Sequence, residues 1–179
     1  AEAAAKHMNP SFKSSRQTPP PELLLQLFVH LEAKDILEAF SKKDLAKRLL
    51  GGKVQNMDLE RQWVSLLKSE CGAGYTSKME GMFQDVLWSR ETMARYTPPE
   101  GIDMDVQVLT TGYWPVYPNY ALQLPECLEK PQNHFIEYYN KTYQGRRIVW
   151  QYSLGQVTIK ARFSQKMHDL VMSLSMALV

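Results

Sequence analysis

The sequence predicts an α+β protein: a helical bundle followed by a small mixed α/β domain with a four- to five-stranded sheet. Three observations predict this fold class. Up to about residue 98, apolar side chains recur every three or four positions, which is typical of amphipathic helices. From residue 99 they alternate with polar side chains, which indicates half-buried strands. The length of 179 residues accommodates one domain or two small ones, so no second large domain fits.

The first 21 residues are expected to lie outside the folded part. Residues 1–8 (AEAAAKHM) have the form of an EAAAK-type helical spacer followed by a cloning remnant. Residues 9–21 are polar and rich in proline, which indicates a flexible lead-in that ends where a helix begins.

The helical half, residues 22–98, is expected to contain four helices in a bundle. Asp35 is the expected N-cap of the second helix, and glycines at 51 and 52 end it. Ser77 and Glu80 have capping-box spacing at the expected start of the fourth helix. The expected ranges are about 22–34, 35–49, 58–71 and 77–86, with a continuation over 89–96.

The second half, residues 99–173, is expected to form the α/β domain. A helix is expected over 131–143, with Pro131 in its first turn. A turn at Leu154 and Gly155 should join two strands in a hairpin. The expected strands cover about 102–108, 120–124, 148–152, 157–163 and 167–172, and residues 174–179 resemble the start of another helix.

The charge balance excludes a broadly basic surface. The chain has 21 Lys and Arg against 19 Asp and Glu, for a net charge of +2. A dedicated nucleic-acid or anionic-membrane binder needs an excess of cations, so any basic site must be a local patch. The longest apolar stretch, residues 23–31, is far shorter than the roughly 20 residues that span a bilayer. Cys71 and Cys127 stand alone, which favours a reducing compartment.

No motif in the sequence supports catalysis, a metal site or a bound cofactor. The four histidines lie far apart, and no Cys/His cluster is present. Asp103 and Asp105 alternate with apolar residues, so they are interpreted as the solvent face of a strand. The glycine-rich stretch 72–78 follows a helix and lacks the spacing of a phosphate-binding loop. Neither cysteine lies in a nucleophile motif.

Two features remain as candidate binding sites. Lys42, Lys43, Lys47 and Arg48 are expected to form a basic helix surface, which is either a dock for an acidic partner or a solvated face that complements the helix dipole. The predicted sheet should leave open edges, to which a partner strand could add, although every small sheet has this property. The residues alone leave both choices open.

Four separate stretches resemble the cullin homology region, in the order and spacing of that family. They are DILEAFSKKDLAKRLL from residue 35, ECG at 70–72 with YTSKMEGMFQD from residue 75, VLTTGYWP from residue 108 and GRRIVW from residue 145. The stretches at 42–50 and 70–85 are most similar in sequence to cullins that pair with the damaged-DNA-binding adaptor or with BTB-domain adaptors. The cullin-like subunit of the anaphase-promoting complex is the alternative relative. Ser41 stands where the family usually has an aromatic residue.

The resemblance implies a non-catalytic scaffold of a RING ubiquitin ligase in the nucleus and cytoplasm. In this family a strand of the RING-box protein joins the α/β sheet, and the candidate strands here are 106–110, 148–152, 157–163 and 169–172. The residues carried over for this contact are Val106, Val108, Thr110, Val149, Gln151, Thr158, Lys160, Asp169 and Val171. The family also attracts the acidic tail of a ubiquitin-conjugating enzyme with a basic canyon, which Lys42, Lys43, Lys47 and Arg48 match.

Further expectations concern what the chain lacks in comparison with the family. Part of the bundle is expected to be shortened, and residues 174–179 are expected to begin a truncated winged-helix region. The lysine that accepts a ubiquitin-like modifier and the arm that binds adaptors are expected to be absent. Two rivals remain, namely an enzyme that uses Asp103 and Asp105 or Cys71, and a fragment that self-associates through its open sheet edge.

Overall fold

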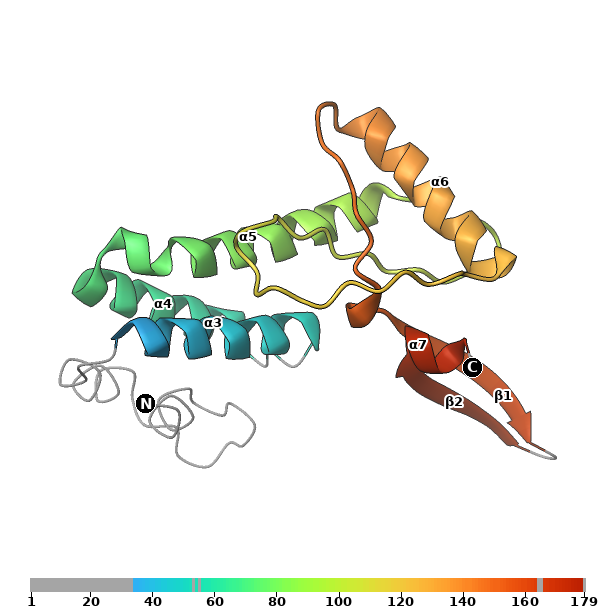
Figure 1. The fold of residues 1–179 in the computed structure, drawn as a ribbon, viewed down its shortest axis with the longest axis horizontal. Coiled ribbons are helices and arrows are strands. Elements are labelled where there is room, and N and C mark those ends of the chain that lie inside the picture. Colours follow the sequence, from blue (N-terminus) through green and yellow to red (C-terminus); the bar gives the residue numbers. More distant parts are fainter. Residues whose placement is uncertain (1–33, 53, 55, 164–165, 179) are drawn as a thin grey trace. The chain divides into compact units, whose positions relative to one another are not determined.

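The computed structural model describes residues 34–52, 54, 56–163 and 166–178 (Figure 1). The chain forms two compact units. Among the described residues, the first comprises those from 34 to 94 together with Val106–Pro115, and the second comprises Arg95–Asp105 and those from 116 to 178. The helix expected over 22–34 lies outside the described residues, except for Lys34, as do the spacer and the lead-in.

Helix α3 (Lys34–Leu50) agrees closely with the expected second helix. Asp35 lies in its first turn rather than at the N-cap, because the helix already begins at Lys34. Lys47 and Arg48 lie in the last turn, where cations complement the negative end of the helix dipole. Gly52 follows with a φ of 61°, a left-handed conformation that ends a helix at little cost for glycine.

Helix α4 (Met57–Cys71) begins one residue before the expected start. The Asn56 side chain caps it by accepting hydrogen bonds from the backbone N–H groups of Asp58 at 3.0 Å and Leu59 at 3.2 Å. Gly72 ends it with a φ of 84°, as the sequence predicts. Local capping chemistry therefore determines both ends of α4.

Helix α5 (Ala73–Arg95) is longer than expected and includes both helical segments predicted over 77–96. The predicted capping box is wrong, because Gly72 already turns the chain and α5 starts at the next residue. Ser77 is therefore inside the helix, where its hydroxyl donates to the carbonyl of Gly74 at 3.2 Å. Glu80 instead accepts hydrogen bonds from Thr76 and Lys68.

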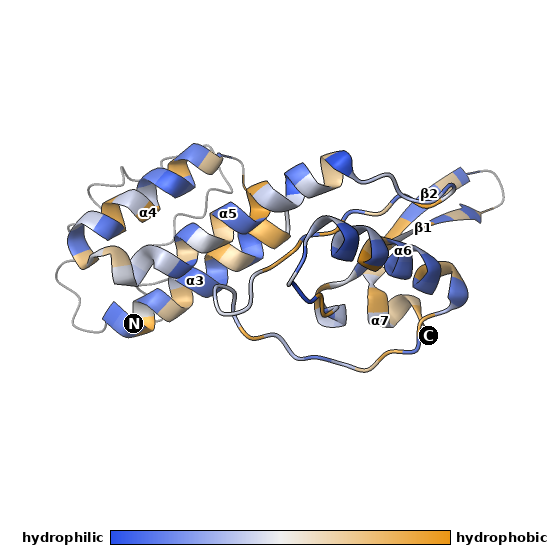
Figure 2. Ribbon diagram, turned by 90° about the horizontal axis from the view of Figure 1, so that it is seen from above, coloured by the Kyte–Doolittle hydropathy of each residue, from blue (hydrophilic) through white to orange (hydrophobic). Residues whose placement is uncertain are grey.

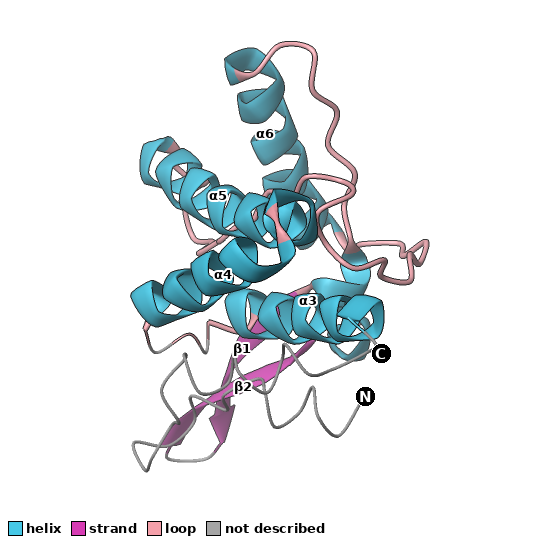
Figure 3. Cartoon of the chain, turned by 90° about the vertical axis from the view of Figure 1, so that its left-hand side faces the viewer, coloured by secondary structure: helices cyan, strands magenta, loops and turns pink. Residues whose placement is uncertain are grey.

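The three helices lie side by side in the first unit and share one apolar core (Figure 3). Each helix contributes side chains that are almost completely buried. They are Leu45, Ala46 and Leu49 from α3, Trp63, Val64 and Leu67 from α4, and Met79, Met82, Phe83 and Val86 from α5. The amphipathic pattern of the first half thus indicates most of the buried positions, but Ile36 and Leu59, which the same pattern places inward, are exposed.

The segment Val106–Pro115 belongs to the first unit, although its alternating pattern predicts a strand of the second domain. Its first half, 106–110, forms neither helix nor strand, 111–113 form a turn, and the segment has no strand partner among the described residues. Its backbone N–H groups at Val108 and Thr110 donate to side chains of α5 instead. Trp114 is buried, as expected for its large ring. The strand expected here is therefore wrong, because alternation indicates an extended chain with one buried side but does not specify its partner.

The second unit contains helix α6 (Glu126–Thr142), which begins five residues before the expected start. The backbone N–H groups of Leu128 and Glu129 donate to the carbonyl of Pro125, so the first turn forms ahead of Pro131. Pro131 is consequently inside the helix and buried. Phe135 and Tyr139 are buried, and Phe135 packs edge-on against Tyr96, with a centroid separation of 5.1 Å.

The sheet has two strands among the described residues, fewer than the four or five expected. Strand β1 (Gln156–Phe163) pairs antiparallel with β2 (Lys166–Ser173). The expected hairpin between 148–152 and 157–163 is wrong, because η1 (Tyr152–Leu154) is a 3-10 turn and β1 pairs with the strand that follows it. No β-ladder forms within the described chain at three of the stretches expected to be strands, namely 102–108, 120–124 and 148–152. The short helix α7 (Leu174–Ala177) returns to η1, where the N–H of Leu174 donates to the carbonyl of Gly155 at 2.9 Å.

Candidate partner-binding surfaces

The C-terminal half of α3 carries the predicted basic residues. Lys43 and Lys47 are exposed and lie four residues apart, so they project from the same side of the helix. Lys42 is half-buried. Within the described part of the chain, neither Lys43 nor Lys47 forms an ion pair. We call Lys42, Lys43 and Lys47 the α3 basic face.

Arg48, the fourth predicted member, has a different environment. Its Nε donates to Glu60 Oε1 at 2.6 Å, and its Nη2 donates to Oε2 at 2.9 Å. The Glu60 side chain is 2% exposed and that of Arg48 is 18% exposed. Such a bidentate pair stabilises the charge on both partners in a site that excludes water. Arg48 therefore connects α3 to α4, and its charge is largely neutralised by Glu60.

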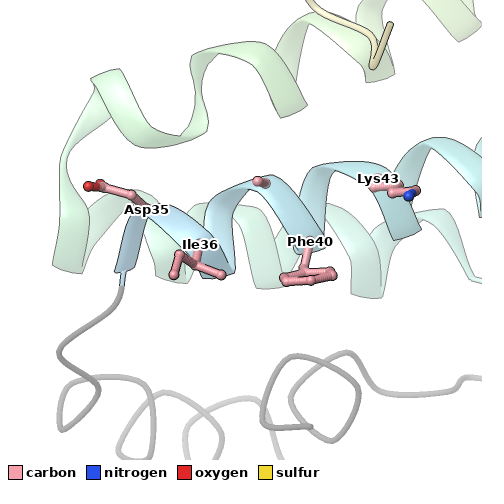
Figure 4. Close-up of a pocket in the computed structure, with 5 residues that line it drawn as sticks. Asp35, Ile36, Phe40 and Lys43 are labelled. Carbon is pink, nitrogen blue, oxygen red and sulfur yellow. The ribbon is translucent and has the colours of Figure 1, made fainter. Parts of the chain in front are cut away.

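A shallow apolar depression of about 440 Å³ lies next to the α3 basic face. Ile36, Ala39 and Phe40 line it, with Asp35 at one end and Lys43 at the other. Ile36 and Phe40 project from the same side of α3 (Figure 4), and Ile36 is 49% exposed. A partner that reaches Lys43 would also meet apolar surface.

Four of the predicted partner residues lie together on one face of the β1–β2 hairpin. The register places Thr158 opposite Val171 and Lys160 opposite Asp169, and all four are exposed. Because neighbouring residues of a strand point to opposite faces, these two pairs share a face. The structure thus brings together four residues from two strands whose pairing the sequence did not predict. They are Thr158, Lys160, Asp169 and Val171.

The opposite face of the hairpin is mainly apolar and incompletely covered. It is formed by Val157, Ile159, Ala161, Phe163, Leu170 and Met172, with His168 and Lys166 towards the hairpin end. Ile159 is 41% exposed and Phe163 is 57% exposed. Figure 2 shows the resulting alternation of hydrophilic and hydrophobic residues along the strands. A hairpin of this kind is marginally stable in water unless another layer covers it.

Both outer edges of the hairpin lack a neighbouring strand among the described residues. Such an edge presents unpaired backbone N–H and C=O groups, which can pair with an added strand. The main chain then supplies affinity, and the side chains on the two faces supply specificity. The chemistry available here is therefore strand addition.

The remaining predicted partner residues do not lie on the hairpin. Val106, Val108 and Thr110 belong to the other compact unit. Val149 and Gln151 lie in the stretch before η1, which is neither helix nor strand, and Val149 is 66% exposed. The amide of Gln151 donates to the carbonyl of Pro118 at 2.6 Å.

The groups considered for catalysis show no activating environment. Partial burial raises the pKa of the Cys71 thiol, despite a smaller lowering effect of Lys34. A raised pKa reduces the thiolate fraction, which is the opposite of what a nucleophile needs. Asp103 and Asp105 are exposed. The described residues contain no group of three or more His, Cys, Asp or Glu side chains that could hold a metal ion.

None of the helices within the described ranges combines the length and the apolar character that a membrane-spanning segment needs.

Sequence reasoning missed the role of Asp85 and Ser89. Both are buried on α5 and bind the backbone of Val106–Pro115. A signal was present, because these two polar residues stand four positions apart, next to the buried apolar residues Met82 and Val86. A polar pair at helical spacing within an apolar face needs hydrogen-bond partners, and the extended segment provides them.

Each half of the chain matches a model of a known protein family. Residues 21–93 match a family model described as the cullin alpha solenoid domain. Residues 108–179 match a second model, described as the cullin alpha+beta domain.

Individual relatives agree with these matches. Cullin-4A of Mus musculus is 38% identical over 193 residues, which cover all of this chain and 25% of the relative. Cullin-3A of Arabidopsis thaliana is 42% identical over 156 residues, with 84% of this chain and 21% of the relative covered. Cullin-1 of Oryza sativa is 37% identical over 160 residues, with 85% and 22% covered. The chain thus spans about a quarter or less of the relatives it matches.

Proposed function

Because the chain belongs to the cullin family, we propose that it is the part of a ubiquitin-ligase scaffold that holds the RING-box subunit. The role is non-enzymatic, since a scaffold accelerates transfer by bringing reactants together rather than by chemistry of its own. The proposed cellular location is the nucleus and cytoplasm.

The observation that carries this proposal is the β1–β2 hairpin. It has two open edges and an apolar face with Ile159, Phe163 and Leu170 exposed. An added strand from the RING-box protein would satisfy the unpaired backbone groups of one edge and extend the apolar face. We propose Thr158, Lys160, Asp169 and Val171 as contacts on the opposite face.

A second proposed contact is between the α3 basic face and the acidic tail of a ubiquitin-conjugating enzyme. Lys43 and Lys47 are exposed and form no ion pair within the described chain, so their charges are available to an incoming anion. Arg48 contributes little to this contact, because Glu60 already binds it. Complementary charge of this kind mainly raises the association rate.

The first test is co-purification of the chain with a RING-box protein. We expect a one-to-one complex on size-exclusion chromatography with light scattering. A chain that is folded by circular dichroism but remains uncomplexed would contradict the proposal. A homodimer that persists in the presence of the RING-box protein would favour self-association through the open edge instead.

Proline substitution can then identify the edge. Adjacent residues of a strand direct their N–H groups to opposite edges, and proline lacks this group. Of Thr158→Pro and Ile159→Pro, one should therefore break the β1–β2 ladder, and the other should keep the hairpin while blocking the outer edge of β1. Asp169→Pro and Leu170→Pro test β2 in the same way.

Alanine at the same four positions is the matched control, because it keeps the N–H. We expect one proline variant with an intact hairpin to lose the RING-box protein while its alanine counterpart binds. If all proline variants with intact hairpins bind normally, the partner does not pair with either edge.

A further inference from the structure

One side of α3 changes from apolar to basic along its length. Its residues stand at successive intervals of four, three and four positions, which places them on the same side of an α-helix. They are Ile36, Phe40, Lys43 and Lys47. All of them are exposed except Phe40, which is half-buried. We call these four residues the α3 stripe.

The apolar end of the α3 stripe forms the depression described above. All five residues that line it come from α3. Ile36 and Phe40 project from the same side of the helix (Figure 4), and Lys43 lies at the edge of the depression. Apolar surface that is exposed to water is unfavourable, so an apolar side chain of another molecule gains free energy by covering it.

The charges at the two ends of the depression differ, and they determine which partner fits. Asp35 lies at one end and Lys43 at the other, with Lys47 one turn further along the helix. Neither lysine forms an ion pair within the described ranges. An acidic segment is therefore attracted at the lysine end and repelled at the Asp35 end. The complementary partner has an apolar side chain in the depression and acidic residues that extend towards Lys47.

A second copy of this chain complements the α3 stripe less well than an acidic partner does. Two copies of the stripe face to face would bring together more lysines than aspartates, because Asp35 is the acidic residue that lines the depression and both Lys43 and Lys47 lie beyond it. The excess positive charge opposes such a contact. An acidic segment instead supplies the opposite charge at each lysine.

The spacing along the α3 stripe matches an extended peptide. From the midpoint between Ile36 and Phe40, the helix rises by about 7.5 Å to the fifth residue and by about 13.5 Å to the ninth, which are the positions of Lys43 and Lys47. Two and four residues of an extended chain cover about 6.6 and 13.2 Å, and alternate residues point to the same side. An apolar residue in the depression therefore places the residues two and four positions away from it near the two lysines.

We propose that the depression on α3 is a docking site for one apolar side chain of the acidic segment that binds Lys43 and Lys47. The motif that fits is an apolar residue with acidic residues two and four positions away on the same side. This inference rests on the proposed contact between the α3 basic face and an acidic tail, and it adds an apolar anchor to that contact. Charge then raises the association rate, and the anchor determines which acidic segments dissociate slowly.

The first experiment measures the binding of two synthetic peptides to the full chain by fluorescence anisotropy. Both peptides carry the same acidic residues, and they differ only in having leucine or alanine at the anchor position. We expect the leucine peptide to bind about tenfold more tightly. High salt should weaken both peptides but preserve this ratio, because salt screens exposed charges and does not weaken apolar contacts. Equal affinity of the two peptides would overturn the proposal.

A substitution in the depression then locates the anchor. Ile36→Gln introduces a polar side chain and keeps a residue that favours the helix. We expect the affinity ratio of the two peptides to fall from about tenfold to about twofold in this variant. Leu59→Gln makes the same kind of change on α4, where Leu59 is also exposed, and should leave the ratio as in the parent chain. A ratio in Ile36→Gln that equals that of the parent would overturn the proposal.

The same peptides separate this inference from the proposed contact on which it rests. We expect Lys43→Glu with Lys47→Glu to weaken both peptides. If the reversal weakens both but the parent chain binds the two equally, the contact with an acidic tail stands and the apolar anchor is wrong. If neither peptide binds the parent chain, both the contact and the anchor are wrong.

Two further measurements distinguish the other occupants of the depression. We expect Ile36→Gln and Leu59→Gln to change the melting temperature by similarly small amounts, because both side chains are exposed. A much larger decrease in Ile36→Gln would mean that another part of the same chain covers the depression. A dimer that light scattering detects in the parent chain and not in Ile36→Gln would mean that a second copy covers it. Either result would overturn the proposal.

Discussion

The helical bundle and the β1–β2 hairpin use apolar side chains in opposite ways. In the bundle, Leu67 is 1% exposed and Met82 is fully buried, so these apolar side chains pack inside the core. In the hairpin, Leu170 is 38% exposed and Val171 is 67% exposed. The comparison teaches that the bundle is stabilised by its own core, whereas the hairpin exposes apolar surface and has edges without a neighbouring strand among the described residues.

Their charged pairs differ in the same way. Arg48 and Glu60 form a bidentate ion pair in which Glu60 is buried and Arg48 is partly buried. Lys160 and Asp169 stand opposite each other in the hairpin register, and both are exposed. The first pair should be essential to the fold, and the second should contribute little to it.

The largest expected effect is that of Glu60→Ala. Removing this carboxylate leaves the Arg48 guanidinium partly buried without a partner, so we expect the free energy of unfolding to fall by about 3–5 kcal/mol. Urea denaturation followed by tryptophan fluorescence measures it. Glu70→Ala is the matched control on the same helix, because Glu70 is exposed, and it should change stability by less than about 0.5 kcal/mol. Equal effects would contradict the assigned role of the pair.

The same substitution at two leucines compares the two regions directly. Leu67→Ala should lower the free energy of unfolding by about 2–5 kcal/mol, since it opens a cavity in a closed core. Leu170→Ala should cost less than about 1 kcal/mol in the isolated chain. It should cost more when the RING-box protein is bound, because an added strand would extend the apolar face on which Leu170 lies. Denaturation with and without the partner gives both values, and a large loss for Leu170→Ala in the isolated chain would contradict the open face.

A charge reversal tests the exposed surface of the bundle. We expect Lys43→Glu with Lys47→Glu to slow association with an acidic-tailed conjugating enzyme by about tenfold at low salt, and by less at high salt. Stopped-flow fluorescence measures the rate. Arg61→Glu with Lys78→Glu makes the same change of charge at exposed positions on other helices. If both double variants slow association equally, net charge rather than the α3 basic face determines the rate.

The smallest expected effect is the coupling between Lys160 and Asp169. A double-mutant cycle with Lys160→Ala and Asp169→Ala should give a coupling of about 0.2–1 kcal/mol, typical of exposed cross-strand pairs. Thermal unfolding of the four proteins measures it. A coupling of several kcal/mol would show that the hairpin is as well packed as the bundle.

Sequence reasoning succeeded where the determinants are local. Both ends of α4 were predicted to within one residue, because Gly72 and the residues around Asp58 determine them. The extent of α5 was not predicted, because Gly72 permits the helix to start directly after it, before Ser77. Helical periodicity also predicted most of the buried positions of the bundle, although Ile36 and Leu59 fit the pattern and are exposed.

Prediction failed where a residue's partner is distant in sequence. Alternation predicted strands near Val108 and Trp150, and the described chain forms none there, because the pattern does not reveal whether a strand, a helix or another molecule receives the backbone hydrogen bonds. Arg48 and Lys47 received the same prediction as members of a basic surface, although Glu60 binds Arg48 in the structure. The assignment of the hairpin and α3 residues to partners remains a prediction.

Hydrogen exchange of the hairpin, with and without a RING-box protein, tests the central claim most directly. In the isolated chain we expect fast exchange over 156–163 and 166–173, and slow exchange in the cores of α4 and α5. On binding, at least one of the two strands should become protected, while the bundle core should change little. A stable complex that leaves both strands as unprotected as before would contradict the claim that the open hairpin is completed by a partner strand.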